Sequence, residues 1–256
     1  RLHGMFCEGS AVLHDDASHR AFRLRFVPRA WKLGLVQKIE VFMDRSIPEI
    51  VKHVFDLHDL SAADLDLRLT GDYPKREFVV QYAETDLAFI SRLTEHLCIA
   101  FYVRHDDDRD RVVFVDGADA YEKPERSTVA WRDNRQPRAI HQIESTQRMI
   151  PSVYAVHDYN YRTPMVDLSQ TVESSAGASG GVVEFGPHVK TLEEARRLAQ
   201  TRAEEREATA LVYDGTSDDA ALGAGRVIHV DGHPTLEHRD LLVTEVEHRV
   251  EQSALL

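Results

Sequence analysis

The clearest strand signal in the chain is an alternation of apolar and charged residues near its beginning. Phe22, Leu24 and Phe26 share one parity, and arginines occupy the positions between them. Side chains alternate between the two faces of a strand, so this pattern predicts a strand with the three apolar residues on a buried face. Pro28 should end that strand, because proline has no amide hydrogen for the next ladder bond.

Three segments begin with helix-capping residues and continue with apolar residues at helical spacing. Ser46 and Glu49 form a capping box before a helix that reaches about His58, and proline in its first turn costs no hydrogen bond. Thr85 and Asp86 can cap a second helix. A second capping box predicts a third helix, on the surface, over residues 191–208. The predicted apolar faces are Ile50, Val51, Val54, Phe55 and His58; Phe89, Ile90, Leu93 and Leu97; and Ala195, Leu198, Ala199 and Ala203.

Further strands are predicted wherever β-branched and aromatic residues cluster between turn residues. Two of these runs flank the charged segment 105–111, which predicts a hairpin with a solvated tip. Many strands with only three helices, not regularly interleaved, predict an α+β, β-dominated fold. The predicted strands are 65–69, 78–82, 99–103, 112–115, 140–147, 153–161, 226–230 and 241–250.

Residues 169–181 are rich in serine and glycine, which is typical of a flexible linker, here between β-rich halves. Within them, residues 177–181 match G-x-S-x-G, the turn that presents a nucleophilic serine in some hydrolases. A strand-like run follows Ser179 instead of a helix, so no helix amino end supports an oxyanion hole. We therefore interpret the segment as a linker and expect it to be dispensable for folding.

The charge and the cysteine content exclude several classes of protein. The 256 residues include 31 Lys and Arg against 43 Asp and Glu, for a formal net charge of −12. Such a surface repels phosphates, so nucleic acid is not an expected partner. No stretch has the apolar length of a membrane-spanning helix or a Sec signal peptide, so membrane insertion is not expected either. Cys7 and Cys98 alone form no disulfide framework.

Three chemical patterns in the sequence resemble parts of known sites, but none of them predicts a site. Asp106, Asp108 and Asp110 alternate as in a calcium loop, but Arg111 and Gly117 occupy the places of the required glycine and glutamate. The 14 histidines include no H-E-x-x-H pair. Paired carboxylates near the second helix are explained by capping. We therefore assign no catalytic, cofactor-binding or metal-binding residues and expect no enzyme activity and no cofactor.

Residues 76–105 read REFVVQYAETDLAFISRLTEHLCIAFYVRH, which closely resembles a segment of VgrG proteins, the spikes of type VI secretion systems. The family pattern there is V-Q-Y-x-E-S-D-x-x-F-x-x-R-L-x-E-x-x-G-I-x-Y-x-F-x-H. Thr85, Cys98 and Phe101 replace serine, glycine and tyrosine of that pattern. The matching positions are Gln81, Tyr82, Glu84, Asp86, Phe89, Arg92, Leu93, Glu95, Ile99 and His105.

The resemblance continues in order along nearly the whole chain. Residues 28–33 resemble the family's P-x-x-W-x-L, and residues 41–51 resemble its entry into a helix. Residues 158–164 resemble its aromatic segment before a proline. Gly225, His233, Pro234, Val243, Thr244 and His248 resemble its closing pattern.

This resemblance implies a structural protein, the phage-hub-like base of a spike. It implies two barrel-like domains with peripheral helices: 1–40 belongs to the first, 41–125 forms a helix-containing middle domain, and 126–256 forms the second, including loop 169–181 and helix 191–208. The implied partners are two further copies in a homotrimer, a hexameric Hcp-like tube, and the spike or needle module with its effectors. Assembly in the bacterial cytoplasm and later secretion are implied.

The resemblance leaves alternatives open. The same fold serves the hubs of phage tails and of extracellular contractile injection systems. A hydrolase or metalloenzyme is a weaker alternative. The chain also resembles a fragment, because its first residues match a strand inside the first barrel. Within a homotrimer, the arginine-rich segment 132–138 is a candidate contact for acidic surfaces.

Overall fold

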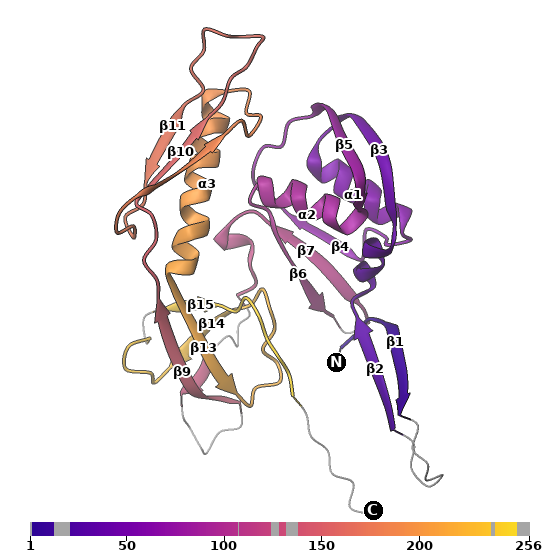
Figure 1. Ribbon diagram of the computed structural model, residues 1–256. Coiled ribbons are helices and arrows are strands. Elements are labelled where there is room, and N and C mark those ends of the chain that lie inside the picture. Colours follow the sequence, from indigo (N-terminus) through magenta and orange to yellow (C-terminus); the bar gives the residue numbers. More distant parts are fainter. Residues whose placement is uncertain are drawn as a thin grey trace, which may run out of the picture. The chain divides into compact units, whose positions relative to one another are not determined.

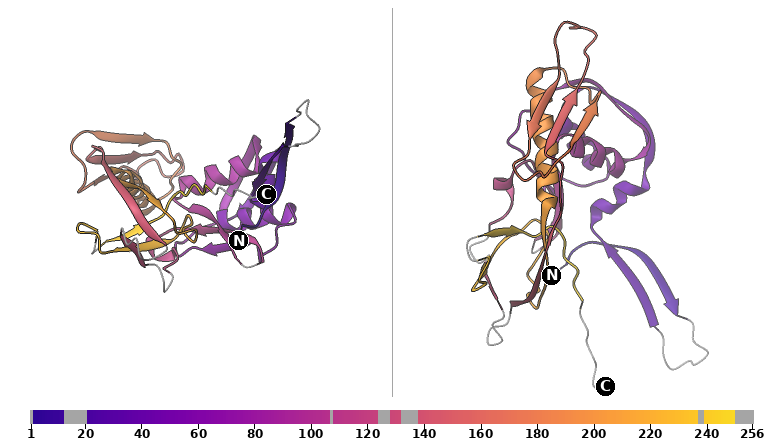
Figure 2. Two further views of the ribbon diagram at one scale, coloured as in Figure 1. Left: turned by 90° about the horizontal axis from the view of Figure 1, so that it is seen from below. Right: turned by 60° about the vertical axis from the view of Figure 1, so that its left-hand side comes forward.

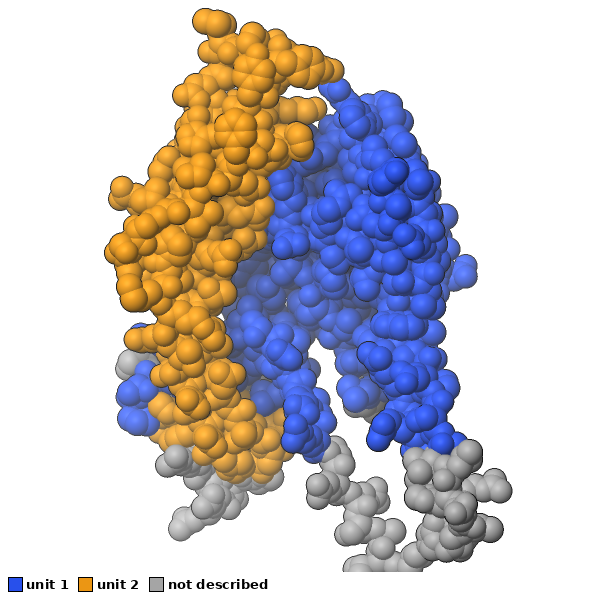
Figure 3. All heavy atoms as spheres, viewed as in Figure 1, with its two compact units in different colours: residues 1–128, 221–230, 234–256 blue, residues 129–220, 231–233 orange. Residues whose placement is uncertain are grey.

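The computed structural model describes residues 2–12, 21–106, 108–123, 128–131, 138–236 and 239–249. The chain divides into two compact units (Figure 3). Unit 1 comprises Arg1–Thr128, Ala221–Val230 and Pro234–Leu256, and unit 2 comprises Val129–Ala220 and Asp231–His233. Most of the arginine-rich segment 132–138 lies outside the described residues. The division into a middle domain and two barrel-like domains stays a prediction.

In unit 1, two helices lie between two sheets (Figure 1). One sheet pairs β3 with β5, and the other has the strand order β4-β7-β6. Both sheets and both helices contribute to one core, in which Phe42 stacks on Phe89 with ring centroids 5.4 Å apart. The elements are α1 (Ile47–Leu57), α2 (Asp86–His96), β3 (Gln37–Arg45), β4 (Leu65–Arg68), β5 (Arg76–Thr85), β6 (Ala100–His105) and β7 (Asp110–Val115).

The helix predictions in unit 1 are confirmed, including the side chains that begin α1. The Glu49 amide donates to the Ser46 hydroxyl, and the Ser46 amide donates to the Glu49 carboxylate over 2.8 Å. The predicted apolar residues of both helices are buried, except for the partly exposed His58 and Leu97. Each helix therefore presents its apolar stripe to the core, as the spacing predicts.

Both helices end in a Schellman motif, in which the residue after the cap takes a left-handed conformation. In α2 that residue is Cys98, with a φ of 53°. The Cys98 amide donates to the Glu95 carbonyl, and the Ile99 amide donates to the Thr94 carbonyl. Glycine is favoured at this position because it has no Cβ to clash.

The first hairpin, β1 (Met5–Val12) with β2 (Ala21–Val27), corrects one sequence expectation (Figure 2). The predicted strand is present, but its apolar face is not buried. Phe22, Leu24 and Phe26 are 65%, 56% and 67% exposed. The pair is a separate two-stranded sheet, so no third strand or helix of the described residues covers that face.

The remaining elements of unit 1 are short. The 3₁₀ helices η1 (Arg29–Leu35) and η2 (Ala118–Ala120) follow β2 and β7. β14 (Val227–Asp231) pairs with β15 (Asp240–Leu242). The strand predicted over 241–250 therefore stops at Leu242. Its alternation continues, but a strand also needs a neighbour for its ladder, and residues 244–249 have none among the described residues.

Unit 2 places one long helix on a small sheet. α3 (Leu192–Ala210) covers β10 (Val153–His157) and β11 (Gln170–Glu173), and β10 also pairs in parallel with β12 (Gly181–Phe185). The predicted face of α3 is buried. A second strand set contains β8 (Thr128–Trp131), β9 (Ala139–Gln147) and β13 (Leu211–Ser217). The α+β, strand-dominated prediction is confirmed. None of the described helices is long and apolar enough to cross a membrane.

The linker predicted over 169–181 is wrong, because the segment is part of the folded sheet. It contains β11, which pairs with β10 along four residues. Ser174 is buried, and its hydroxyl donates to Glu207 on α3 over 2.5 Å. A Cβ on Gly177 would lie 2.3 Å from the Cα of Ser152. Serine and glycine here serve close packing, so we no longer expect the segment to be dispensable.

The strand predicted over 153–161 is shorter than expected. It ends at His157 because the carboxylate of Asp158 accepts the amides of Val189 and Tyr159, which turns the chain. Asparagine and aspartate compete with the sheet ladder in this way. The exposed tyrosines that follow therefore belong to a loop.

Replacing Cys98 by glycine should stabilise the protein by about 1 kcal/mol, because the left-handed backbone is strained for cysteine. Cys7→Gly is the matched control: Cys7 lies in β1, where glycine should cost about 0.5–1 kcal/mol. Urea denaturation measures both. A destabilised C98G would show that the cysteine side chain contributes more than the backbone strain removes.

Candidate functional site

The segment 81–86, which carries the family resemblance, forms a bulge at the end of β5. Ile39 on β3 faces two residues on β5, Tyr82 and Ala83, and Ala83 takes a φ of 49°. The Gln81 amide group closes the bulge by donating to the Glu84 carbonyl over 3.1 Å. The bulge thus lets β5 turn directly into α2.

Asp86, the first residue of α2, points into the protein and is fully buried. Its carboxylate lies 2.7 Å from Nε2 of His58, accepts from Nε2 of Gln81 over 2.9 Å, and lies 3.4 Å from Nζ of Lys38. These partners come from the end of α1, from β5 and from β3. We call Lys38, His58, Gln81 and Asp86 the Asp86 cluster. Asp86 therefore joins the elements of unit 1 instead of capping α2, and Thr85 alone supplies the cap.

The pKa of Asp86 is lowered despite its burial. Burial raises the pKa of a carboxyl group, but the hydrogen bonds from His58 and Gln81 and the charge of Lys38 outweigh that effect. The ionised form of Asp86 is therefore the one that the fold stabilises.

Two other residues of the motif have structural roles. Arg92 on α2 pairs with the carboxylate of Glu84 over 2.6 Å and donates to the Val80 carbonyl over 3.2 Å. Its guanidinium also lies 5.5 Å from the centroid of Phe89. The motif residues thus hold β5 and α2 together.

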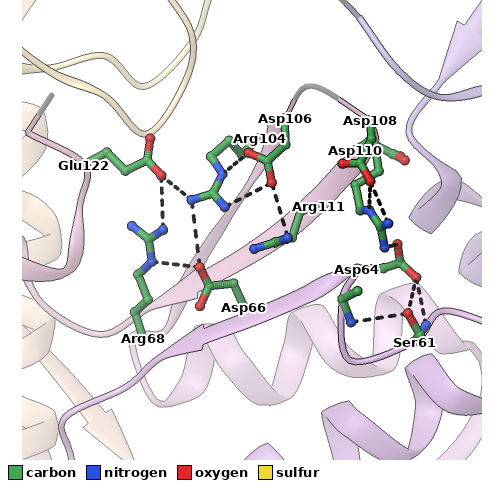
Figure 4. Close-up of polar contacts among 12 residues, drawn as sticks. Ser61, Asp64, Asp66, Arg68, Arg104, Asp106, Asp108, Asp110, Arg111 and Glu122 are labelled. Atoms are coloured by element: carbon green, nitrogen blue, oxygen red, sulfur yellow. Dashed lines mark hydrogen bonds and ion pairs between the residues drawn. The ribbon is translucent and has the colours of Figure 1, made fainter. Parts of the chain in front are cut away.

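A network of charged side chains covers the sheet β4-β7-β6 (Figure 4). Arg104 pairs with Asp106 and Glu122, and Arg68 pairs with Glu122 over 3.1 Å. Arg111 lies 3.4 Å from Asp106. The ladder between β6 and β7 runs out to the pair His105 and Asp110, so the solvated tip is shorter than predicted.

Arg29, in the segment that resembles P-x-x-W-x-L, is a clamp between three parts of unit 1. Its guanidinium bonds Asp64, after α1, over 2.7 Å, and Asp110, at the start of β7, over 2.5 Å. Asp64 also accepts from the amide and the hydroxyl of Ser61. Burial raises the pKa of both carboxyl groups, but the bonds from Arg29 outweigh it and leave each pKa lowered.

The aspartates that resemble a calcium loop are therefore paired with arginines. Asp106 bonds Arg104, Asp108 bonds Arg109 over 2.7 Å, and Asp110 bonds Arg29. Across the described part of the chain, no three His, Cys, Asp or Glu side chains are grouped to hold a metal ion. His53 and His58 point to different partners, Glu40 and Asp86.

The G-x-S-x-G segment has no hydrolase geometry. Ser179 is exposed in the turn between β11 and β12, and β12 follows it in place of a helix. The backbone carbonyl of Gly180 accepts from the Ser152 amide and hydroxyl, so the turn closes the sheet. A nucleophile elbow needs a helix amino end after the serine.

Gly225, which matches the family's closing pattern, lies against an aromatic ring. Its φ is 82°, and a Cβ there would lie 2.3 Å from Cε2 of Tyr102. Tyr102 in turn stacks on Tyr121 with ring centroids 5.9 Å apart. Gly225 thus lets the segment 221–230 pack closely against β6 within unit 1. The sequence showed that Gly225 matches the family pattern but not that it contacts Tyr102.

One face of the sheet β3–β5 carries apolar side chains that stay exposed in the described part of the chain. β3 and β5 pair Val41 with Val80 and Met43 with Phe78 on the side opposite the core, and the bulge adds Ile39 and Tyr82. We call these six residues the β3–β5 outer face. Their exposed fractions run from 36% at Val80 to 73% at Tyr82. The sequence did not predict the β3–β5 outer face, because it did not predict β3.

Asp86→Asn should lower the free energy of unfolding by about 3 kcal/mol at pH 7, because it leaves the other members of the Asp86 cluster without their anion. The pKa of Asp86 is lowered on folding, so its contribution is complete above the unfolded value of about 3.9 and is lost as pH falls through the folded pKa. The free energies of unfolding of the unmodified chain and of the variant should therefore approach each other as the pH falls. Urea titrations between pH 7 and pH 2 measure both free energies. The exposed control Asp56→Asn should change stability by less than about 0.5 kcal/mol.

Gly225→Ala should cost about 3 kcal/mol or more, because it adds a clash with Tyr102 to the strain of a left-handed residue. Gly232→Ala isolates the strain: its φ is 76° and a Cβ would meet nothing within 4 Å. That control should cost about 1–2 kcal/mol. Equal losses in thermal unfolding would contradict the packing role of Gly225.

Comparison with known proteins identifies the family of this chain. The model of the family "Phage tail baseplate hub (GPD)" matches residues 1–254. The type VI secretion system spike protein VgrG1c of Pseudomonas aeruginosa is 26% identical over 247 residues, which cover 91% of this chain and 33% of that protein. The chain thus spans about a third of the length of this relative.

Solved structures show the same fold. The E. coli c3393 protein, a type VI secretion component with structural similarity to the T4 bacteriophage tail proteins gp27 and gp5, matches with a TM-score of 0.68 at 20% identity. The match covers 95% of this chain and 55% of that one. The 43 kDa tail protein of prophage MuSo2 from Shewanella oneidensis matches with a TM-score of 0.63 at 13% identity, covering 93% and 72%. With its hub fold and its structural motif residues, the chain belongs to the phage tail baseplate hub family.

Proposed function

We propose that this chain is the hub at the base of a VgrG-type spike in a contractile injection apparatus, and that it acts as a structural part and not as an enzyme. The match of the hub family to residues 1–254 is the observation that carries the proposal. The structure supports it, because the motif residues 81–92 bind one another and the G-x-S-x-G turn lacks the helix that a nucleophile elbow needs.

The proposed assembly is a homotrimer that sits between a hexameric Hcp-like tube and the spike or needle module with its effectors. Residues 1–40 and 126–256 would supply its barrel-like domains. The uncovered face of the hairpin β1–β2 supports this arrangement, since a two-stranded sheet is marginally stable alone. Assembly takes place in the bacterial cytoplasm, and the hub then leaves the cell with the spike.

A second candidate is the hub of a phage tail or of an extracellular contractile injection system. The likeness to the prophage tail protein favours it, although that likeness concerns the fold alone. The two candidates differ in the tube that the hub meets. Binding to a purified Hcp hexamer, measured by biolayer interferometry, supports the type VI assignment, and binding only to a phage tail-tube protein supports the alternative.

The hub proposal predicts that the purified chain has a solution mass of three times 29.1 kDa. Sedimentation equilibrium measures this mass over a range of concentrations. The net charge of −12 repels other copies, so association should strengthen as salt screens it, unless specific ion pairs dominate the interface. A monomer at every concentration and ionic strength would contradict trimerisation through this chain.

A further inference from the structure

The β3–β5 outer face is a continuous apolar surface made by two strands that are distant in sequence. The register places Val41 opposite Val80 and Met43 opposite Phe78, and Tyr82 lies opposite Ile39 at the bulge. Cross-strand neighbours of this kind lie about 5 Å apart, so the six side chains form one patch. The opposite face carries Phe42 and Val79, which are already buried in the core.

The size of this patch is that of a protein interface. Ile39, Met43, Phe78 and Tyr82 are each 61% to 73% exposed. Given about 150–250 Å² for a large side chain, the outer face exposes roughly 600 Å² of mainly apolar surface. That is at the upper limit for the largest patch of a typical monomer. With a polar rim it reaches the share of about 800 Å² that each partner contributes to a standard interface.

One end of the outer face carries two arginines on neighbouring strands. Arg45 and Arg76 are a directly opposed pair in the register, and like charges in this position destabilise a sheet. Among the described residues neither arginine lies within 4.0 Å of a carboxylate oxygen, and the charge of Arg45 reaches Glu49 only far enough to help lower the pKa of that carboxyl group. An acidic surface that docks on this face would neutralise both arginines. A second copy of the chain is a partner of the right charge, since its acidic side chains outnumber its basic ones, 43 to 31.

We propose that the β3–β5 outer face is the surface by which each copy of this chain docks onto the next copy; the proposal rests on the homotrimer proposed above. A ring of three needs a contact between two different surfaces. The outer face therefore meets another, partly acidic surface of the neighbouring copy. The apolar side chains fill the centre of the contact, and Arg45 and Arg76 fix its orientation at the rim.

The test compares two double variants by sedimentation velocity and native mass spectrometry. Met43→Asp with Phe78→Asp places two carboxylates in the middle of the outer face. Met149→Asp with Phe185→Asp makes the same changes at residues that are 83% and 80% exposed in unit 2. All four side chains are exposed, so circular dichroism should show both variants folded.

We expect the unmodified chain and the unit 2 variant to be trimers and the M43D/F78D variant to be a monomer. Its dissociation constant should rise at least 100-fold, about the effect of two central interface residues. A trimeric M43D/F78D variant overturns this inference and leaves the hub proposal intact, because another partner then covers the face. A monomeric unmodified chain contradicts both. Unfolding of M43D/F78D alone would show that the face belongs to the core, and this too overturns the inference.

A charge reversal tests the rim separately. Arg45→Glu with Arg76→Glu should raise the dissociation constant of the trimer about tenfold at low salt, and the effect should shrink as salt increases. The conservative pair Arg45→Lys and Arg76→Lys keeps both charges and should stay within about twofold. An R45E/R76E variant that trimerises as tightly as the unmodified chain would show that no acidic surface docks at this end.

Discussion

A two-stranded sheet has two faces and no neighbouring strands, and much of unit 1 is arranged around this constraint. The sheet β3–β5 buries Phe42 and Val79 against α1 and α2, which in turn rest on the three strands β4-β7-β6. The helices thus receive a cover on both sides. The cost is an outer apolar face on β3–β5 that this unit cannot cover with any of its described elements. The fold therefore buries its helices, and the outer face of β3–β5 can be buried only against a partner.

The Asp86 cluster explains how so thin a sheet keeps its position over the helices. Apolar packing is not directional, so it would tolerate small shifts of β5 over α2. The buried carboxylate accepts from Gln81 and lies beside His58, and both contacts are lost if the strand or a helix moves by one residue. The bulge at Ala83 places Gln81 for this contact. A polar group in the core therefore contributes a fixed register here, at the cost of desolvating its charge.

The sequence predicts the local elements of this fold better than the surroundings of each element. Both helices of unit 1 follow from their caps and apolar spacing, which act over a few residues. The burial of a face cannot be predicted from such local signals. The alternation around Leu24 correctly predicts a strand, but it does not show whether another layer covers the apolar face of that strand. β3 escapes prediction because Ile39, Val41, Phe42 and Met43 place apolar side chains on both faces, which removes the alternation. The segment 169–181 misleads because its serine and glycine serve tight packing.

The candidate surface could not be predicted from the sequence for the same physical reason. A catalytic site concentrates unusual residues at fixed spacing, whereas a docking face of a structural protein uses ordinary apolar residues. Here those residues come from two segments that are about forty positions apart and meet only through the register of β3 with β5. The resemblance located the motif at Gln81 and Asp86 but could not give its role. Its inward residues fix the register, and that register aligns the outward ones into a surface. The polar motif and the apolar face are therefore two consequences of one strand pairing.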